Sequence, residues 1–150
     1  MKLIVQKDSE ALKAWSFTGN VIQSIFMMPR ISLKSFSRAP EVLVMDCTYN
    51  TNRFNRPVMI VSSVTQENHW YPLAYGWLET ENTSTFDWFI DRFVDAIGPA
   101  NLEGVRVVLT DGEQAYNAVL KQYFPRAKQQ RLDAHTVASM RRNSYSYLHV

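Results

Sequence analysis

Residues 41–49 read EVLVMDCTY, and this stretch decides the fold. Its apolar run, VLVM, offers apolar side chains to both faces of a sheet, which is typical of a central strand. Asp46 interrupts this run. A carboxylate inside such a strand costs several kcal/mol unless charges or hydrogen bonds compensate it. The stretch therefore predicts a central strand that carries a carboxylate in need of an explanation.

Two more strands are predicted at short intervals, over residues 57–64 (PVMIVSSV) and 69–77 (HWYPLAYGW). Loops this short favour antiparallel hairpins, so the three strands should form a meander. Pro72 has no N–H group to donate, which predicts that the third strand lies at an edge of the sheet.

A helix is predicted over residues 84–97, where apolar side chains recur at helical spacing. Ser84 is its expected N-cap, and Gly98 and Pro99 are expected to end it. The remaining segments are a strand over 105–109, a helix over 115–123 and a last strand over 127–132. The order β-β-β-α-β-α-β predicts an α/β fold with a mixed sheet, and it is the element order of an RNase H-like domain.

The rest of the chain shows weaker patterns. Residues 11–15 and 21–28 could form short helices or belong to the end of a preceding region. We expect three regions: a partly helical lead-in over 1–39, a core over 40–132 and a divergent tail over 133–150. No stretch approaches the roughly 18 consecutive apolar residues of a membrane span, and the first residues lack a secretory pattern, so no membrane contact is expected.

The chain has 150 residues and a net charge of only +2, but the charge is distributed unevenly. Residues 1–40 contain six Lys or Arg and two acids, residues 41–120 four Arg and eleven acids, and residues 121–150 six Lys or Arg and one acid. An acidic centre between basic ends fits a cation site beside a surface that binds a polyanion. A solvated acidic face with ordinary basic ends would give the same pattern. Cys47 is the single cysteine, which excludes an intrachain disulfide and favours a reducing compartment.

Asp46 and Asp111 are the candidate site residues. Asp111 directly follows the strand over 105–109, and ligands of α/β sheets gather at the carboxyl ends of parallel strands. In the expected topology the two strands are adjacent and parallel, so both carboxylates could share a divalent ion such as Mg²⁺. Two alternatives stay open. Asp46 could be a buried carboxylate satisfied by backbone N–H groups or an arginine, and Asp111 could be a helix N-cap with Gln114 at the third position.

Other polar residues are weaker candidates. We expect Glu79 and Glu81 in a solvated loop and Glu113 in the first turn of a helix. Cys47 and His69 are expected to be packing and loop residues. Asp133 and His135 could bind a metal, but two ligands do not define a zinc site.

Three blocks of sequence stand in order: PEVLVMDCTYNTNRFNRPVMIVSSVT at residues 40–65, YPLAYGWLETENTSTFDWFIDRF at 71–93 and VVLTDGEQAYNAVLKQYFPRAKQQ at 107–130. Together they resemble the catalytic domain of Mutator-like element (MULE) transposases, and the D-x-T-Y-x-T-N core of the first block is specific to that family. SIFMMPRISLKSFSRAP at residues 24–40 resembles the family's lead-in, so the likeness covers roughly residues 24–132.

The resemblance implies an RNase H-like fold and a DDE-type transposase. Such enzymes use Mg²⁺ or Mn²⁺ to cut a DNA strand and to join the freed 3′ hydroxyl to target DNA. Asp46 matches the family's first acid and Asp111 its second, as catalytic and metal-binding residues. The family's third acid, a Glu, lies well downstream and has no match before Val150. We therefore expect the chain to stop before the last helical elements and to be inactive by itself.

The resemblance also implies transposon ends and target DNA as partners and a nuclear location, and it leaves a homo-oligomer open. Basic residues expected to contact phosphates are Lys121, Arg126, Lys128, Arg131, Arg141 and Arg142. The family's Leu-Cys-x-x-His run is replaced by Leu132-Asp133-Ala134-His135, which lacks the Cys and is one residue shorter. The alternative function is an inactive remnant or a domesticated module that binds DNA or protein.

Overall fold

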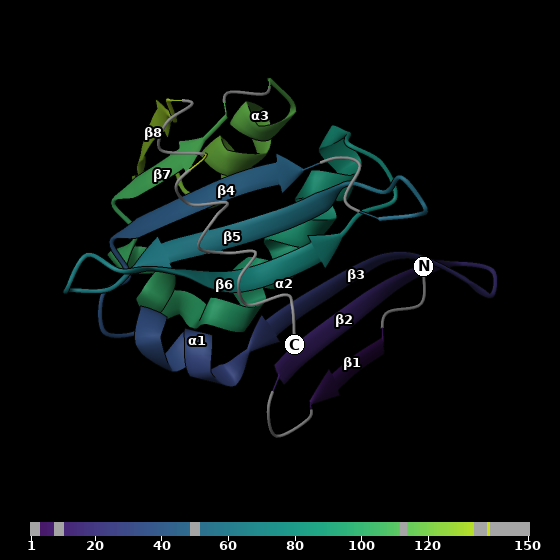
Figure 1. Cartoon of the computed structure of the whole chain (residues 1–150), viewed down its shortest axis with the longest axis horizontal. Coiled ribbons are helices and arrows are strands. Elements are labelled where there is room, and N and C mark those ends of the chain that lie inside the picture. The colour runs from purple at the N-terminus through teal and green to yellow at the C-terminus, as the bar shows by residue number, and fades with distance from the viewer. Residues whose placement is uncertain (1–3, 8–10, 49–51, 112–113, 134–137, 139–150) are drawn as a thin grey trace.

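The computed structural model describes residues 4–7, 11–48, 52–111, 114–133 and 138. Within this part of the chain, eight strands form one mixed sheet in the order β1-β2-β3-β6-β5-β4-β7-β8 (Figure 1). The strands are β1 (Ile4–Lys7), β2 (Ala11–Thr18), β3 (Val21–Pro29), β4 (Val42–Thr48), β5 (Val58–Val64), β6 (Trp70–Trp77), β7 (Val107–Thr110) and β8 (Lys128–Arg131). The helices are α1 (Arg30–Phe36), α2 (Thr83–Gly104) and α3 (Gln114–Tyr123).

The expected α/β topology is confirmed from β4 onward. Strands β4, β5 and β6 form an antiparallel meander, and α2 then crosses to β7, which pairs parallel to β4. After α3 the chain returns as β8, parallel to β7. The sheet is therefore mixed, with β4 between an antiparallel and a parallel neighbour.

The lead-in departs from the helices that the sequence suggested over 11–15 and 21–28. Both segments are strands, β2 and β3, which pair with each other across the turn at Gly19. Burial along β3 alternates from Ser24 onward, as expected for a strand with one face on the core. Because β3 also pairs with β6, hydrogen bonds join the lead-in to the central sheet. Its helical part is α1.

Pro72 does not place β6 at an edge, because β6 lies between β3 and β5. The proline is tolerated for two local reasons. Strand β3 pairs with β6 only opposite residues 75–77, so Pro72 lies beyond that pairing. On the other side, the register with β5 shifts beside Ser62, the partner of Pro72. The rule about edges holds for the residue rather than for the whole strand.

Helix α2 begins one residue earlier and runs further than the sequence predicted. Its N-cap is Asn82, whose side chain accepts a hydrogen bond from the Thr85 N–H, and Ser84 lies inside the helix. Gly98 does break the helical geometry, with φ 79°, but a further helical segment follows as far as Gly104. None of the described helices combines the length and apolar character that a bilayer crossing requires.

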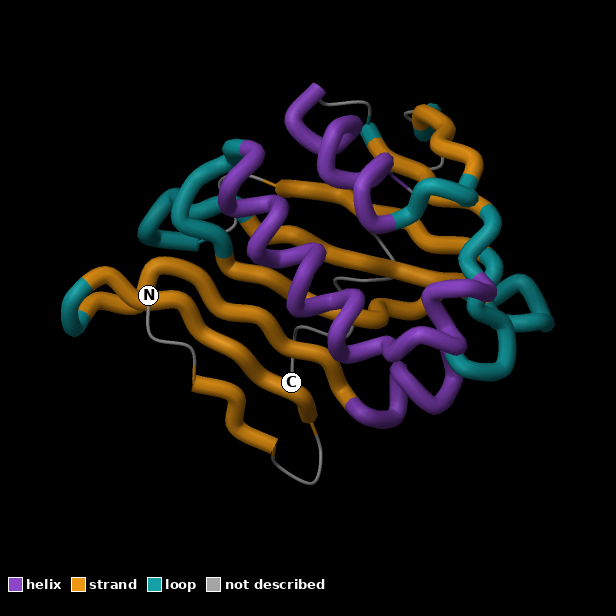
Figure 2. The backbone as a smooth tube through the Cα atoms, turned by 180° about the vertical axis from the view of Figure 1, so that it is seen from behind, coloured by secondary structure: helices purple, strands orange, loops and turns teal. Residues whose placement is uncertain are grey.

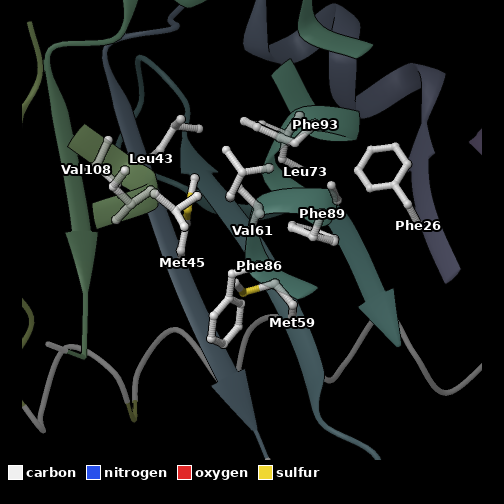
Figure 3. Packing of buried hydrophobic residues seen from close by; sticks show 14 of the residues in the cluster. Phe26, Leu43, Met45, Met59, Val61, Leu73, Phe86, Phe89, Phe93 and Val108 are labelled. Carbon is white, nitrogen blue, oxygen red and sulfur yellow. The ribbon is translucent and has the colours of Figure 1, made fainter. Parts of the chain in front are cut away.

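Helices α2 and α3 cover one face of the central sheet, as seen from behind in Figure 2. The predicted apolar face of α2 is confirmed: Phe86, Phe89, Ile90, Phe93 and Ile97 are all buried. The side chains of this face pack on side chains from β4, β5 and β6 (Figure 3). Phe89 meets Phe26 of β3 edge to face, with ring centroids 5.4 Å apart, so the same helix also holds the lead-in.

Candidate active site

Asp46 lies in the second half of β4 and is 7% exposed. Its neighbours Met45 and Cys47 belong to the core beneath α2. Because side chains alternate along a strand, Asp46 points to the opposite face of the sheet, which we call the aspartate face. The Thr48 hydroxyl, two residues on and therefore on the same face, donates a hydrogen bond of 3.3 Å to Asp46 Oδ2.

Asp111 directly follows β7 and is partly exposed. The parallel register pairs Val44 with Leu109 and Met45 with Thr110, so one further step sets Asp111 beside Asp46. Val108 lies in the core under the helices, whereas Leu109 packs with Val44 on the other side of the sheet. By the same alternation, Asp111 continues on the aspartate face. The expectation that the two strands are adjacent and parallel is confirmed.

The pKa of Cys47 depends on the charges of these carboxylates. The pKa of the Cys47 thiol is raised to about 12, mainly by burial, against a lowering contribution from the Tyr116 hydroxyl and with smaller raising contributions from the charges of Glu81, Asp46 and Asp111. Burial also raises the pKa of Tyr116, and the charges of Asp111 and Glu81 act in the same direction. The charges of these three carboxylates thus act on one buried thiol at the carboxyl end of β4.

Glu81 is the residue that the sequence reasoning undervalued. It was expected in a solvated loop, and it does lie in the loop between β6 and α2. However, it is only partly exposed, and its charge reaches Cys47 and Tyr116. The sequence carried one usable signal: the loop joins the third strand of the meander to the helix that packs behind it.

The donor set suits a hard divalent cation. Carboxylate oxygens are the ligands that Mg²⁺ and Mn²⁺ prefer, and Mg²⁺ commonly takes only one or two of them from the protein. Within the described residues, no three Asp, Glu, His or Cys side chains gather closely enough to hold an ion. The chemistry of Asp46 and Asp111 therefore fits one hydrated ion, with water or phosphate oxygens as the other ligands.

Those of the weaker candidates that the structure describes do not complete a group of three metal-ligating side chains. His69 is exposed at the start of β6, and Glu79 is exposed beyond its end. Asp133 is exposed after β8, whereas His135 and Glu113 lie outside the described residues. Nothing in the described chain assembles a second metal-ligating group from them.

The basic residues expected to contact phosphate are exposed where the structure describes them. These residues are Lys121 on α3, Arg126 in the following loop, and Lys128 and Arg131 on β8. Arg141 and Arg142 lie outside the described residues. Because β8 adjoins β7, this basic group flanks the strand that leads to Asp111.

Comparison with known proteins points to one family. The family profile described as the MULE transposase domain matches residues 42–138, which is more than half of the chain and contains both aspartates. Such a domain implies an RNase H-like fold, a DDE transposase-type catalytic domain and binding to DNA, and members of this class typically use divalent metals.

A curated relative is less informative. The PKS-NRPS hybrid synthetase cheA of Chaetomium globosum is 24% identical to this chain over 112 residues. The alignment covers 75% of this chain but only 2% of that protein. The likeness therefore concerns one short segment of a very long polypeptide.

Proposed function

The chain belongs to the MULE transposase family, and on that basis we propose that it is a catalytic domain for metal-dependent DNA strand cleavage and transfer. One observation carries the proposal: the strands that bear Asp46 and Asp111 are adjacent, parallel and in register. Their carboxylates then stand at one end and on one face of the sheet. The family match supports the reaction class, and this register supports Asp46 and Asp111 as its residues.

Asp46 and Asp111 would hold the divalent ion or ions. When bound, such ions activate the attacking hydroxyl group and stabilise charge on the oxygens of the phosphodiester. The chain's own contribution is orientation. Strand β4 fixes the Asp46 backbone between two hydrogen-bonded neighbours, and the Thr48 hydroxyl restrains its carboxylate. Little exposure at Asp46 further limits the orientations that this side chain can adopt.

DNA would be held mainly through its phosphates. Of the exposed cations, Arg131 pairs with Thr110, one residue before Asp111, whereas Lys128 pairs with Val107 at the other end of β7. Phosphate contacts by such cations carry no sequence information. Binding should therefore be independent of sequence and should weaken steeply as salt rises.

The test combines Mn²⁺ binding with plasmid nicking. Free Mn²⁺, followed by its electron paramagnetic resonance signal, should fall when wild-type protein is added, and less so with Asp46→Asn or Asp111→Asn. Any nicking of supercoiled plasmid in Mn²⁺ should disappear in the same two variants. Glu103→Gln, a change at an exposed carboxylate of α2, is the matched control and should behave as wild type. Equal Mn²⁺ binding by all four proteins would overturn the assignment of the two aspartates.

A further inference from the structure

A groove of about 670 Å³ opens where the loop between β4 and β5 meets the start of β3 and the end of β6. Its apolar lining comes from Ile22, Ile25, Phe54 and Trp77. Phe54 is 68% exposed and Ile22 43%, so this apolar surface faces solvent. Asn52 and Arg56 complete the wall, and no acidic residue lines the groove.

The loop that presents Phe54 is held in one conformation by its own hydrogen bonds. The side-chain Oδ1 of Asn52 accepts from the backbone N–H groups of Phe54 at 3.1 Å and Arg56 at 3.3 Å. The Asn52 amide donates to the Arg56 carbonyl at 2.7 Å. Arg56 also donates from its guanidinium to the Gln23 carbonyl, which ties the loop to β3. The exposed ring therefore sits on a fixed support.

The chemistry of the groove fits an unpaired nucleobase and its phosphate. The guanidinium carbon of Arg53 lies 4.6 Å from the centre of the Phe54 ring, so a cation and an aromatic face are presented together. Bases of single strands stack on such rings, and nearby arginines attract the phosphates. An apolar protein segment would use the rings but would gain nothing from the two arginines. Charge thus favours the polyanion.

The groove and the aspartates share one end and one face of the sheet. Thr48 pairs with Val58, and Val58 pairs with Trp77. Alternation from Asp46 puts Thr48 on the aspartate face. Val58 and Trp77 lie opposite Thr48 on the next two strands, and they pack against each other. Two strand spacings separate Thr48 from Trp77, about 10 Å. A strand cut near Asp46 would reach the groove within about three nucleotides, at roughly 3.4 Å each.

We propose that this groove binds unpaired bases of the DNA strand that the aspartates act on, with Phe54 as the stacking platform and Arg53 and Arg56 as phosphate contacts. This inference rests on the proposed function for its substrate class. It adds a prediction that the aspartates do not make: the chain prefers DNA with a single-stranded end over blunt duplex.

The test measures binding to two labelled duplexes, one blunt and one with a short 3′ overhang, in EDTA so that cleavage plays no part. Wild type should prefer the overhang. Phe54→Ala and Phe54→Leu should each weaken overhang binding by at least about fivefold while leaving the blunt duplex unchanged, and Phe54→Tyr should retain the preference. A 2-aminopurine base in the overhang should be quenched by wild type and by Phe54→Tyr only.

The leucine variant separates stacking from apolar contact. If Phe54→Leu binds the overhang as wild type does, the base-stacking proposal is wrong. It is also wrong if wild type without DNA sediments as a dimer that Phe54→Ala dissociates, because the groove then takes a second copy. Failure of the proposed function looks different: Mn²⁺ binding becomes insensitive to Asp46→Asn, whatever the overhang preference.

Discussion

On β4 the helix-covered face buries Leu43, Met45 and Cys47, whereas the opposite face carries Val42, Val44 and Asp46. The first set belongs to one large core cluster, and Val44 belongs to a small cluster with Leu132. The odd positions of β4 therefore serve the core, and the even positions include the candidate site residue. The even positions can accept a carboxylate because the odd positions already anchor the strand in the core.

The largest expected effect lies on the helix-covered face. Phe89 is fully buried and contacts Phe26, so Phe89→Ala should lower the free energy of unfolding by about 3–5 kcal/mol. Urea titration measures it. Phe54→Ala, at the exposed ring, is the control and should change stability by less than about 0.5 kcal/mol. Equal losses in the two variants would contradict the division between the faces.

The second prediction adds volume instead of removing it. A methyl group at Gly76 would lie 2.5 Å from the Phe89 ring, which is too close for any real contact. Gly76→Ala should therefore cost about 1–3 kcal/mol, measured by the same titration. In a Phe89→Ala background the added methyl should cost far less, because the ring that it meets is gone. Additive losses would show that strand geometry, and not this contact, requires glycine.

Sequence reasoning succeeded where periodicity was strong and failed where tertiary pairing decided the outcome. The strands over 57–64 and 69–77 and the apolar face of α2 followed from local pattern. The β2–β3 hairpin did not, because its alternation is masked by apolar side chains such as Met27 that pack on the aspartate face as well. Pro72 misled for a related reason, since the register shift with β5 and the short stretch of pairing with β3 were invisible in the sequence.

The candidate site shows the same limit. Asp46 stood out because a charge interrupted an apolar run, and Asp111 because it followed a buried strand. Their common face required the parallel register of β4 and β7, which only the structure supplies. For Glu81 the position of its loop was the one signal, because the charge of a loop residue acts on Cys47 only once β6 and α2 are packed.

The third prediction concerns a gain in stability on the aspartate face. The charges of Asp46, Asp111 and Glu81 act together on Cys47, so this neighbourhood is negative in the absence of a cation. Asp46→Asn should then raise the free energy of unfolding by about 1 kcal/mol in EDTA, as expected when a functional charge is removed. With Mn²⁺ at tenfold its dissociation constant, wild type should gain about 1.4 kcal/mol and the variant less.

Thermal unfolding with and without Mn²⁺ measures both halves of this prediction. Glu103→Gln removes an exposed carboxylate near the end of α2, and it should show neither change. A loss of stability in Asp46→Asn, equal with and without metal, would mean that the carboxylate serves the fold and not a cation.

The smallest expected effect is the pH dependence that Cys47 contributes from beneath the site. Burial, with smaller contributions from the neighbouring carboxylates, raises the folded pKa of this thiol to about 12 from the 9.0 of an unfolded cysteine. Stability from this group is complete below the unfolded pKa and declines as pH rises toward 12. Near pH 9.5 the loss should be about 0.8 kcal/mol, and it should be absent from the pH profile of Cys47→Ala.

Alkylation by iodoacetamide provides a second measurement, because the folded thiol should react slowly at pH 9 and at the normal rate in urea. Rapid alkylation of the folded protein at pH 8 would show that the thiol is accessible as a thiolate, and the helix-covered face would then lack the closure that distinguishes it from the aspartate face.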